Sequence, residues 1–287
     1  MKKEIFSKFI GIVALLAVIV LSANAFRADG SDKLRLYFLD VGQGDAIFME
    51  TPEGEQILVD GGSGTKVLNE LSKILPLGDT TIDLIVLTHN HSDHLRGLEE
   101  VLKHYEIRQI WISGAIHTTD TFKRFLEKIK QKSIPTKAVI AGESINFSGL
   151  EGLVIYPLQE MTGVMPSNQH DATVVTYWQY GENSWLLMGD AETKQERELL
   201  GRGLIKPVTI LKIGHHGSDT SSSEVLLKTA LPEFAVISVG KGNRYDHPSI
   251  ETLKKLTQLN ITVLRTDIAG TIKFSFSRND FTYTTSS

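Results

Sequence analysis

From residue 34 onward the chain alternates short apolar runs with longer amphipathic ones. The short runs are rich in aliphatic and aromatic residues and are separated by Gly-rich turns, a pattern that predicts β-strands. The predicted strands cover 34–40, 46–50, 56–60, 84–87, 109–112, 153–156, 173–180, 184–188, 208–213, 234–239, 262–265 and 270–276.

Apolar residues at helical spacing predict helices at 67–75, 95–104, 119–132, 222–230 and 249–259. Strand meanders interleaved with such helices favour two mixed sheets packed face to face, with the helices outside. A chain of 287 residues with 41% hydrophobic composition is long enough to bury that core. We therefore expect an α/β protein with one domain over residues 31–287.

The N-terminus has the pattern of an export signal. Lys2, Lys3 and Lys8 precede an apolar run at 9–21, which is followed by Ala23, Asn24 and Ala25. A run of 13 residues is short of the roughly 20 that span a bilayer, so a cleavable signal peptide at 1–25 is favoured over an uncleaved membrane anchor. We expect a secreted or extracytoplasmic protein with no stable membrane domain.

The overall charge is acidic, with 30 basic and 34 acidic residues. Without residues 1–25 the chain has 27 basic and 33 acidic residues. This acidic excess argues against tight, sequence-independent binding of nucleic acid by charge alone. Lys212, Lys241 and Arg244 could still form a local positive rim. Cysteine is absent, so any metal ligands must be His, Asp or Glu.

Residues 89–94 read HNHSDH and follow a short apolar strand. His89 and His91, two residues apart on an extended turn, point the same way, and Asp93 and His94 can face a second metal beside the first. This spacing fits two hard or borderline cations better than one.

Three later segments place polar residues beside apolar strands and can complete such a site. His170 and Asp171 precede one strand, Asp190 follows another, and His215 with His216 follows a third. Each segment alone is typical of an ordinary loop. Together, and following the HNHSDH cluster, the three segments favour a role as metal ligands.

This series of residues resembles the ligand series of the metallo-β-lactamase superfamily, over most of residues 34–276. The resemblance implies a four-layer αββα sandwich and two divalent metal ions, with zinc favoured and manganese or iron left open. By resemblance, the first metal is held by His89, His91 and His170, the second by Asp93, His94 and His215, with Asp190 bridging. Whether His215 or His216 is the ligand stays open.

The flanking motifs resemble, more narrowly, the C-terminal hydrolase domain of ComEC-type competence proteins. They are LDVGQGDA at 39–46, LVDGG at 58–62, GDAE at 189–192, GHHGS at 214–218, DHP at 246–248 and RTD at 265–267. Many such relatives carry Asp at position 91 and Asn at position 170, so this chain has the fuller ligand set. Arg96 is a departure, because a glycine is usual there.

The resemblance also implies roles around the metals. Asp45 and Asp60 would orient ligand imidazoles, and a hydroxide bridging the metals would be the nucleophile. Beside Asp93, the candidates for catalysis are His216 and, as first choice of acid, His247. The candidate substrate-binding residues are Ser218, Arg96 and Lys241.

The function that this reading favours is an exported phosphodiesterase or nuclease, with DNA or RNA as the substrate. The alternatives are a cell-envelope phosphoester hydrolase of the phosphocholine or teichoic-acid type, a lactone or β-lactam hydrolase, and a catalytically silent metal-binding module. The membrane-transport role of ComEC proteins does not carry over. Fold alone does not choose among the substrates.

Overall fold

The structure is a computed structural model that describes residues 33–287. The expected signal peptide at 1–25 and its cleavage site lie outside the described residues. Among the helices of residues 33–287, none is long and apolar enough to cross a membrane.

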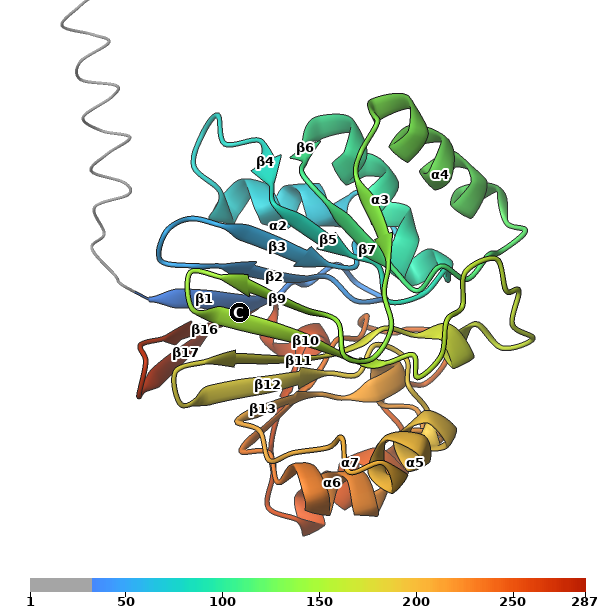
Figure 1. Cartoon of the computed structure of the whole chain (residues 1–287). Helices are drawn as coiled ribbons and strands as arrows, with labels where there is room; N and C mark the ends of the chain where they lie inside the picture. Colours follow the sequence, from blue (N-terminus) through green and yellow to red (C-terminus); the bar gives the residue numbers. More distant parts are fainter. Residues whose placement is uncertain (1–32) are drawn as a thin grey trace, which may run out of the picture.

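An eight-stranded sheet contains the N-terminal strands and, at one edge, the last two strands of the chain (Figure 1). Its order is β17 (Phe281–Thr285), β16 (Ile272–Phe276), β1 (Leu34–Phe38), β2 (Ile47–Glu50), β3 (Gln56–Val59), β5 (Leu84–Val86), β7 (Ile110–Ile112) and β8 (Thr136–Ala138). Strands β3, β5, β7 and β8 run parallel, whereas the others pair antiparallel.

A seven-stranded sheet packs against the first. Its order is β15 (Thr262–Arg265), β14 (Phe234–Ile237), β13 (Ile210–Lys212), β12 (Asn183–Leu187), β11 (Val175–Tyr180), β10 (Leu150–Tyr156) and β9 (Ser144–Phe147). Strands β12 to β15 run parallel. Two short strands, β4 (Thr81–Ile82) and β6 (Glu106–Ile107), form a separate pair.

Helices cover the outer face of each sheet, which confirms the predicted four-layer αββα sandwich (Figure 1). The eight-stranded sheet is covered by α2 (Lys66–Ile74), α3 (Ser92–His104) and α4 (Asp120–Lys132), and the seven-stranded sheet by α5 (Thr193–Gly201), α6 (Glu224–Ala230) and α7 (Ile250–Gln258). A short helix, α8 (Thr266–Ala269), precedes β16.

The core between the sheets is built from the inward residues of both. Trp178 and Trp185 are fully buried there, and the Trp185 ring stacks on Phe276 at 5.2 Å. Burial of aromatic side chains this large dominates the stability of such a core. Both tryptophans are core residues.

The fold brings the carboxyl ends of two sets of parallel strands to one edge of the sandwich. Asp60 and the loop at 89–91 follow β3 and β5 of one sheet, while Asp190 and the turn at 214–217 follow β12 and β13 of the other. Because carboxyl ends of parallel strands meet at one edge, the loops that bear the polar motifs converge there.

Candidate metal centre

Eight of the nine histidines of the chain gather at this edge, and His104 is the exception. Those eight are His89, His91, His94, His117, His170, His215, His216 and His247. More imidazoles gather here than two metal ions need, so some of them are available for substrate.

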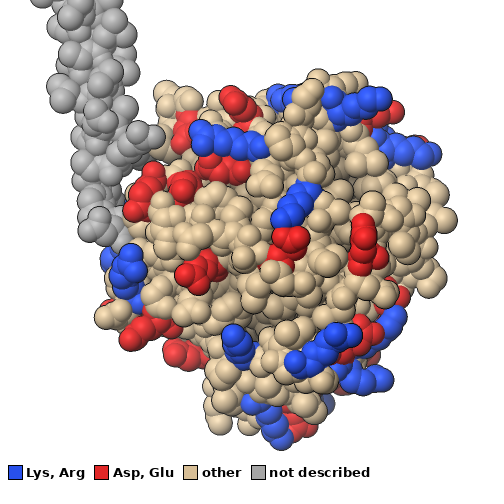
Figure 2. Space-filling view, viewed as in Figure 1, with Lys and Arg blue, Asp and Glu red and all other residues tan. Residues whose placement is uncertain are grey.

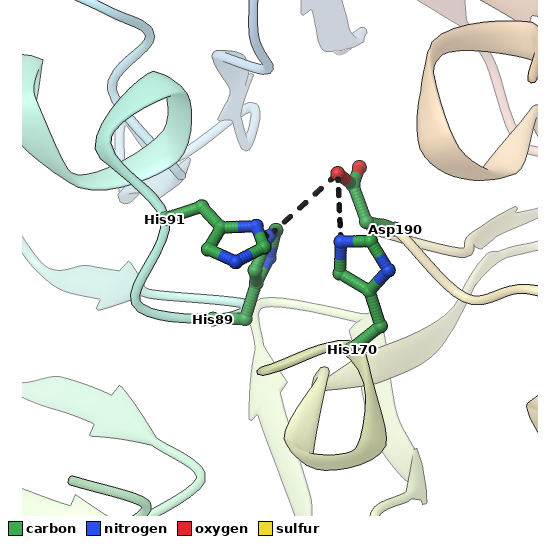
Figure 3. A group of neighbouring side chains, drawn as sticks. All are labelled: His89, His91, His170 and Asp190. Atoms are coloured by element: carbon green, nitrogen blue, oxygen red, sulfur yellow. Dashed lines mark hydrogen bonds and ion pairs between the residues drawn. The ribbon is translucent and has the colours of Figure 1, made fainter. Parts of the chain in front are cut away.

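A first group of ligand atoms comes from His89, His91, His170 and Asp190, all within 4.8 Å of one another. Figure 3 shows these side chains converging from the loop after β5, the 3₁₀ turn at Gln169–Ala172 and the loop after β12. Asp190 Oδ2 lies 3.7 Å from both His89 Nε2 and His170 Nε2. Three imidazoles and one carboxylate form a ligand set suited to zinc or a similar divalent cation.

A second group comes from Asp93, His94 and His216. His216 Nε2 lies 3.4 Å from Asp93 Oδ2, whereas His215 belongs to a different group with His170 and Glu192. The ligand assigned by resemblance at this position is therefore corrected from His215 to His216. Both residues have positive φ, 46° and 52°, and this left-handed turn directs the two adjacent side chains to different places.

Asp190 joins the two groups. Its Oδ1 is 3.3 Å from His94 Nε2, and its Oδ2 is 3.6 Å from His216 Nε2 in addition to its contacts with the first group. Burial alone would raise the pKa of Asp190, but the neighbouring His216 and His94 outweigh burial and hold that pKa well below its ordinary value. A buried carboxylate that stays ionised between two ligand groups is the arrangement that a bridging ligand requires.

The buried polar atoms of this centre fit divalent cations. His94 Nε2, His170 Nε2, His216 Nε2 and Asp190 Oδ1 are all buried without a hydrogen-bond partner. Such atoms are rare in folded proteins because an unsatisfied buried polar group costs about 1–3 kcal/mol. These atoms point toward one another, so cations between them would satisfy the set.

Asp60 lies beneath the second group and holds its member His94 in place. Its backbone has a positive φ of 59°. It accepts hydrogen bonds from Thr88 N at 2.8 Å and Thr88 Oγ1 at 2.7 Å, and its Oδ2 lies 2.7 Å from His94 Nδ1. With Nδ1 carrying the hydrogen, His94 Nε2 is left free for a cation.

Asp45 and Lys212 lie under His216. Lys212 Nζ is 2.8 Å from Asp45 Oδ2 and donates to the Ile213 carbonyl at 2.8 Å, while Asp45 Oδ1 is 3.4 Å from His216 Nδ1. Lys212 is fully buried, so its expected place in a surface rim was wrong. At Gly44, with φ of 104°, a Cβ would lie 1.7 Å from the Asp93 carbonyl oxygen, so only glycine lets this loop reach the centre.

Glu192 is a functional candidate that the sequence analysis missed. Its carboxylate oxygens lie 3.4 Å from His170 Nδ1 and 3.3 Å from His215 Nδ1, and it accepts a hydrogen bond from Thr220 Oγ1 at 2.7 Å. Glu192 thus places a negative charge beside His170 and His215, on the side of His170 away from Asp190. The GDAE motif contained this signal, because it places a second acidic residue two positions after Asp190.

The centre opens into a pocket of about 380 Å³. His247, the candidate acid, lines this pocket, together with residues that the sequence analysis did not select, among them Gln43, His117 and Tyr245.

The three candidate substrate-binding residues do not line the pocket. Among the described residues, Arg96 is exposed on α3 and Lys241 is exposed beyond Gly240, both outside the pocket lining. Ser218 is buried, and its Oγ lies 3.0 Å from Thr220 Oγ1. These three expectations are corrected, because proximity in the chain did not bring the side chains into the pocket.

The two ligand groups are expected to respond differently to pH. Burial and His170 lower the pKa of His91 to about 4. Burial alone would lower the pKa of His216, but Asp190, Asp45 and Asp93 outweigh burial and raise it to about 10. At neutral pH the metal-free chain therefore holds His91 neutral and His216 protonated.

Burial alone would lower the pKa of His94, but Asp190 and Asp60 outweigh burial and hold it well above its ordinary value, so a cation that enters the second group must displace protons from both His216 and His94. Affinity there should rise at least about tenfold per pH unit between about pH 6 and pH 9, with proton release, and more steeply than affinity of the first group. Calorimetric titration with Mn²⁺ in buffers of different ionisation enthalpy measures both quantities. If metal affinity depends equally on pH at the two groups, the assignment of the protonated histidines to the second group is wrong.

The chain belongs to the metallo-beta-lactamase superfamily, whose family model matches residues 39–241. Members of this superfamily are metal-dependent hydrolases that use divalent metals, and the His and Asp groups described above occupy the matched region.

Among curated proteins the chain is similar to competence proteins of the ComEC type. It is 28% identical to ComE operon protein 3 of Bacillus subtilis over 264 residues, covering 85% of this chain and 33% of that protein. It is 29% identical to Recombination protein 2 of Haemophilus influenzae over 242 residues, covering 83% and 28%. The chain thus spans about a third of the length of these relatives.

Solved structures show the same fold. The metallo-beta-lactamase fold protein YhfI from Bacillus subtilis has a TM-score of 0.54 and 12% identity, covering 82% of this chain and 96% of that one. CmlA, a diiron beta-hydroxylase from Streptomyces venezuelae, has a TM-score of 0.55 and 14% identity, covering 86% and 54%. At these identities the likeness concerns the fold alone.

Proposed function

We propose that this protein is an exported phosphodiesterase that cleaves nucleic acid with two divalent cations. The observation that carries the proposal is the pair of ligand groups joined at Asp190, because two adjacent cations suit the in-line displacement of a phosphodiester. The relatives add support, since their names refer to competence and recombination. The proposal of export rests on the N-terminal pattern of residues 1–25.

The chain's own residues would position this reaction. The first cation would be held by His89, His91, His170 and Asp190, and the second by Asp93, His94 and His216, with Asp190 close to both groups. Cations bound there lower the pKa of a water and polarise a phosphoryl oxygen. Zinc suits these ligands, and manganese or iron is the alternative.

Groups around the ligands hold the geometry and contact the substrate. Asp60 and the Ser238 carbonyl hold His94 and His216 from behind, and Asp45 and Glu192 place negative charge beside His216 and His170, so little reorganisation is needed during the reaction. His247 is half-buried at the pocket mouth with its ring 5.6 Å from that of His215. From there it can hydrogen-bond a phosphoryl oxygen or protonate the leaving oxygen.

The pocket mouth disfavours the quaternary ammonium group of phosphocholine, one of the two substrates named for the cell-envelope alternative. A quaternary ammonium group is recognised by open aromatic faces. Here the Arg244 guanidinium lies 4.8 Å from the Tyr245 ring centroid and donates to its hydroxyl at 2.5 Å. A resident cation on this tyrosine repels a second one.

The test is cleavage of labelled single- and double-stranded DNA and RNA, and of bis(p-nitrophenyl) phosphate, by the purified full-length chain with Mn²⁺ or Zn²⁺. We expect the parent and a His104→Ala control to cut nucleic acid, and a double variant with His91→Ala and Asp93→Ala to lose this activity. If the metal-loaded protein hydrolyses only the small diester, or releases phosphocholine from wall material, the nuclease proposal fails.

A further inference from the structure

The metal pocket holds little positive charge for a site that takes a polyanion. Among the described residues that line it, none is a lysine or an arginine. The face drawn in Figure 2 shows basic and acidic side chains intermixed, without a broad basic area. Duplex binding by charge depends on many phosphate contacts from Lys and Arg, so this site requires another source of affinity.

Aromatic rings form a continuous series along the pocket, from Tyr245 through two metal ligands to His117. Successive ring centroids lie 5.8 Å apart from Tyr245 to His247, 5.6 Å on to His215, 4.6 Å on to His170, 5.0 Å on to His91 and 6.5 Å on to His117. Tyr245 and His117 therefore stand at the two ends of the series, with the first ligand group between them.

The end at Tyr245 offers an exposed ring. Tyr245 is 48% exposed although it lines the pocket, which is unusual for a side chain with so much apolar surface. Arg244 holds the hydroxyl of this ring and supplies a cation beside it. A ring fixed at its hydroxyl, with a guanidinium alongside, suits a base next to a phosphate.

The end at His117 continues into a second hollow of about 370 Å³. This hollow shares His91 and His117 with the metal pocket and is also lined by Met165 and Pro166. Met165 is 58% exposed, and the neighbouring Val164 accepts a hydrogen bond from Ile116 N at 2.8 Å, which joins the two loops on this side. The groove thus extends past the ligands in both directions and has apolar surface at each end.

We propose that this groove binds an unpaired segment of a single-stranded nucleic acid, with one base stacked on Tyr245 and a nucleotide on the far side of the metal ligands against Met165. The proposal rests on the proposed function, and it names the form of its substrate. Bases in the interior of a duplex present their faces only to one another, so a ring that stacks beside an internal phosphodiester requires a base that is unpaired. The two hollows place the scissile phosphodiester inside a strand, between two nucleotides.

The test measures KM and kcat of the full-length, metal-loaded chain on a labelled single strand, on the same strand in a duplex, and on a single strand of abasic nucleotides. For the normal single strand we expect Tyr245→Ala to raise KM about tenfold to a hundredfold with kcat nearly unchanged, because it removes one stacked base. Tyr245→Phe should retain most of the affinity, and Met165→Ala should raise KM more weakly.

Two controls separate this result from general damage. Tyr283→Ala removes a tyrosine of similar exposure, 44%, from the edge strand β17 and should leave KM unchanged. The abasic strand should be a poor substrate for the parent and insensitive to Tyr245→Ala.

Cleavage of duplex and single strand at equal rates, or an unchanged KM in Tyr245→Ala, would overturn the inference while the nuclease function stands. Failure to cut any nucleic acid overturns the proposed function, and the inference falls with it.

Discussion

Replacing Lys212 with methionine is expected to lower the free energy of unfolding by about 3–5 kcal/mol. Lys212 is fully buried, and its ammonium is 2.8 Å from the Asp45 carboxylate. Burial alone would raise the pKa of Asp45, and Lys212 is the main group that keeps this pKa below its ordinary value. Methionine fills a similar volume but leaves a buried carboxylate without its nearest cation, with only the His216 imidazolium beside it.

The measurement is urea denaturation of the metal-free protein, so that bound metal does not add to the stability of the parent. Lys241→Met, at an exposed lysine, is the matched control and should change stability by less than about 0.5 kcal/mol. Adding Asp45→Asn to Lys212→Met should recover part of the loss, because the second change removes the uncompensated charge. A loss of less than about 1 kcal/mol in Lys212→Met would show that water reaches Asp45 and stabilises it.

The strands and helices that carry strong apolar patterns were predictable from the sequence. The apolar run before His89 is β5, and the predicted helix at 119–132 is α4, with Thr119 as its N-cap. Several elements were missed, and three of them share a common reason. In α5, β9 and β17 the apolar residues are few and the exposed ones many, so local periodicity is weak and tertiary packing decides the structure.

The candidate site was predictable where its residues are close in sequence. The HNHSDH run contains four candidate ligands on one turn, so local geometry alone brings them together. His215 and His216 could not be separated in this way, because a left-handed backbone at both positions decides which ring turns inward.

Residues that act through distant partners were not predictable. Lys212 has the sequence signature of an ordinary strand-end lysine, and only its contact with Asp45, far away in the chain, shows that it is buried. Tyr245 and His117 likewise line the pocket only because the folded chain brings them there. Their spacing in the sequence does not indicate that they lie close to the metal ligands. The sequence therefore specifies the ligands better than the surface that would select the substrate.

Replacing Asp190 with asparagine is expected to have the largest effect on activity. Asp190 contacts imidazoles of both ligand groups, at 3.3 Å to His94 and 3.7 Å to His170. Asparagine has the same size but no charge, and its amide donates hydrogen bonds where a cation needs an acceptor. Loss of groups that only support metal ligands costs about 10–100-fold, so loss of the shared ligand should cost at least about 100-fold in hydrolysis.

The metal content of the same variant distinguishes a shared ligand from an ordinary buried carboxylate. After dialysis, elemental analysis should find two cations per parent chain and fewer than two per Asp190→Asn chain, because both groups lose the same oxygen donor. Asp219→Asn, at an exposed aspartate beside the GHHGS turn, is the control and should keep the parent's metal content and rate. If Asp190→Asn retains both cations but loses activity, Asp190 acts on the substrate or its water and does not join the two groups.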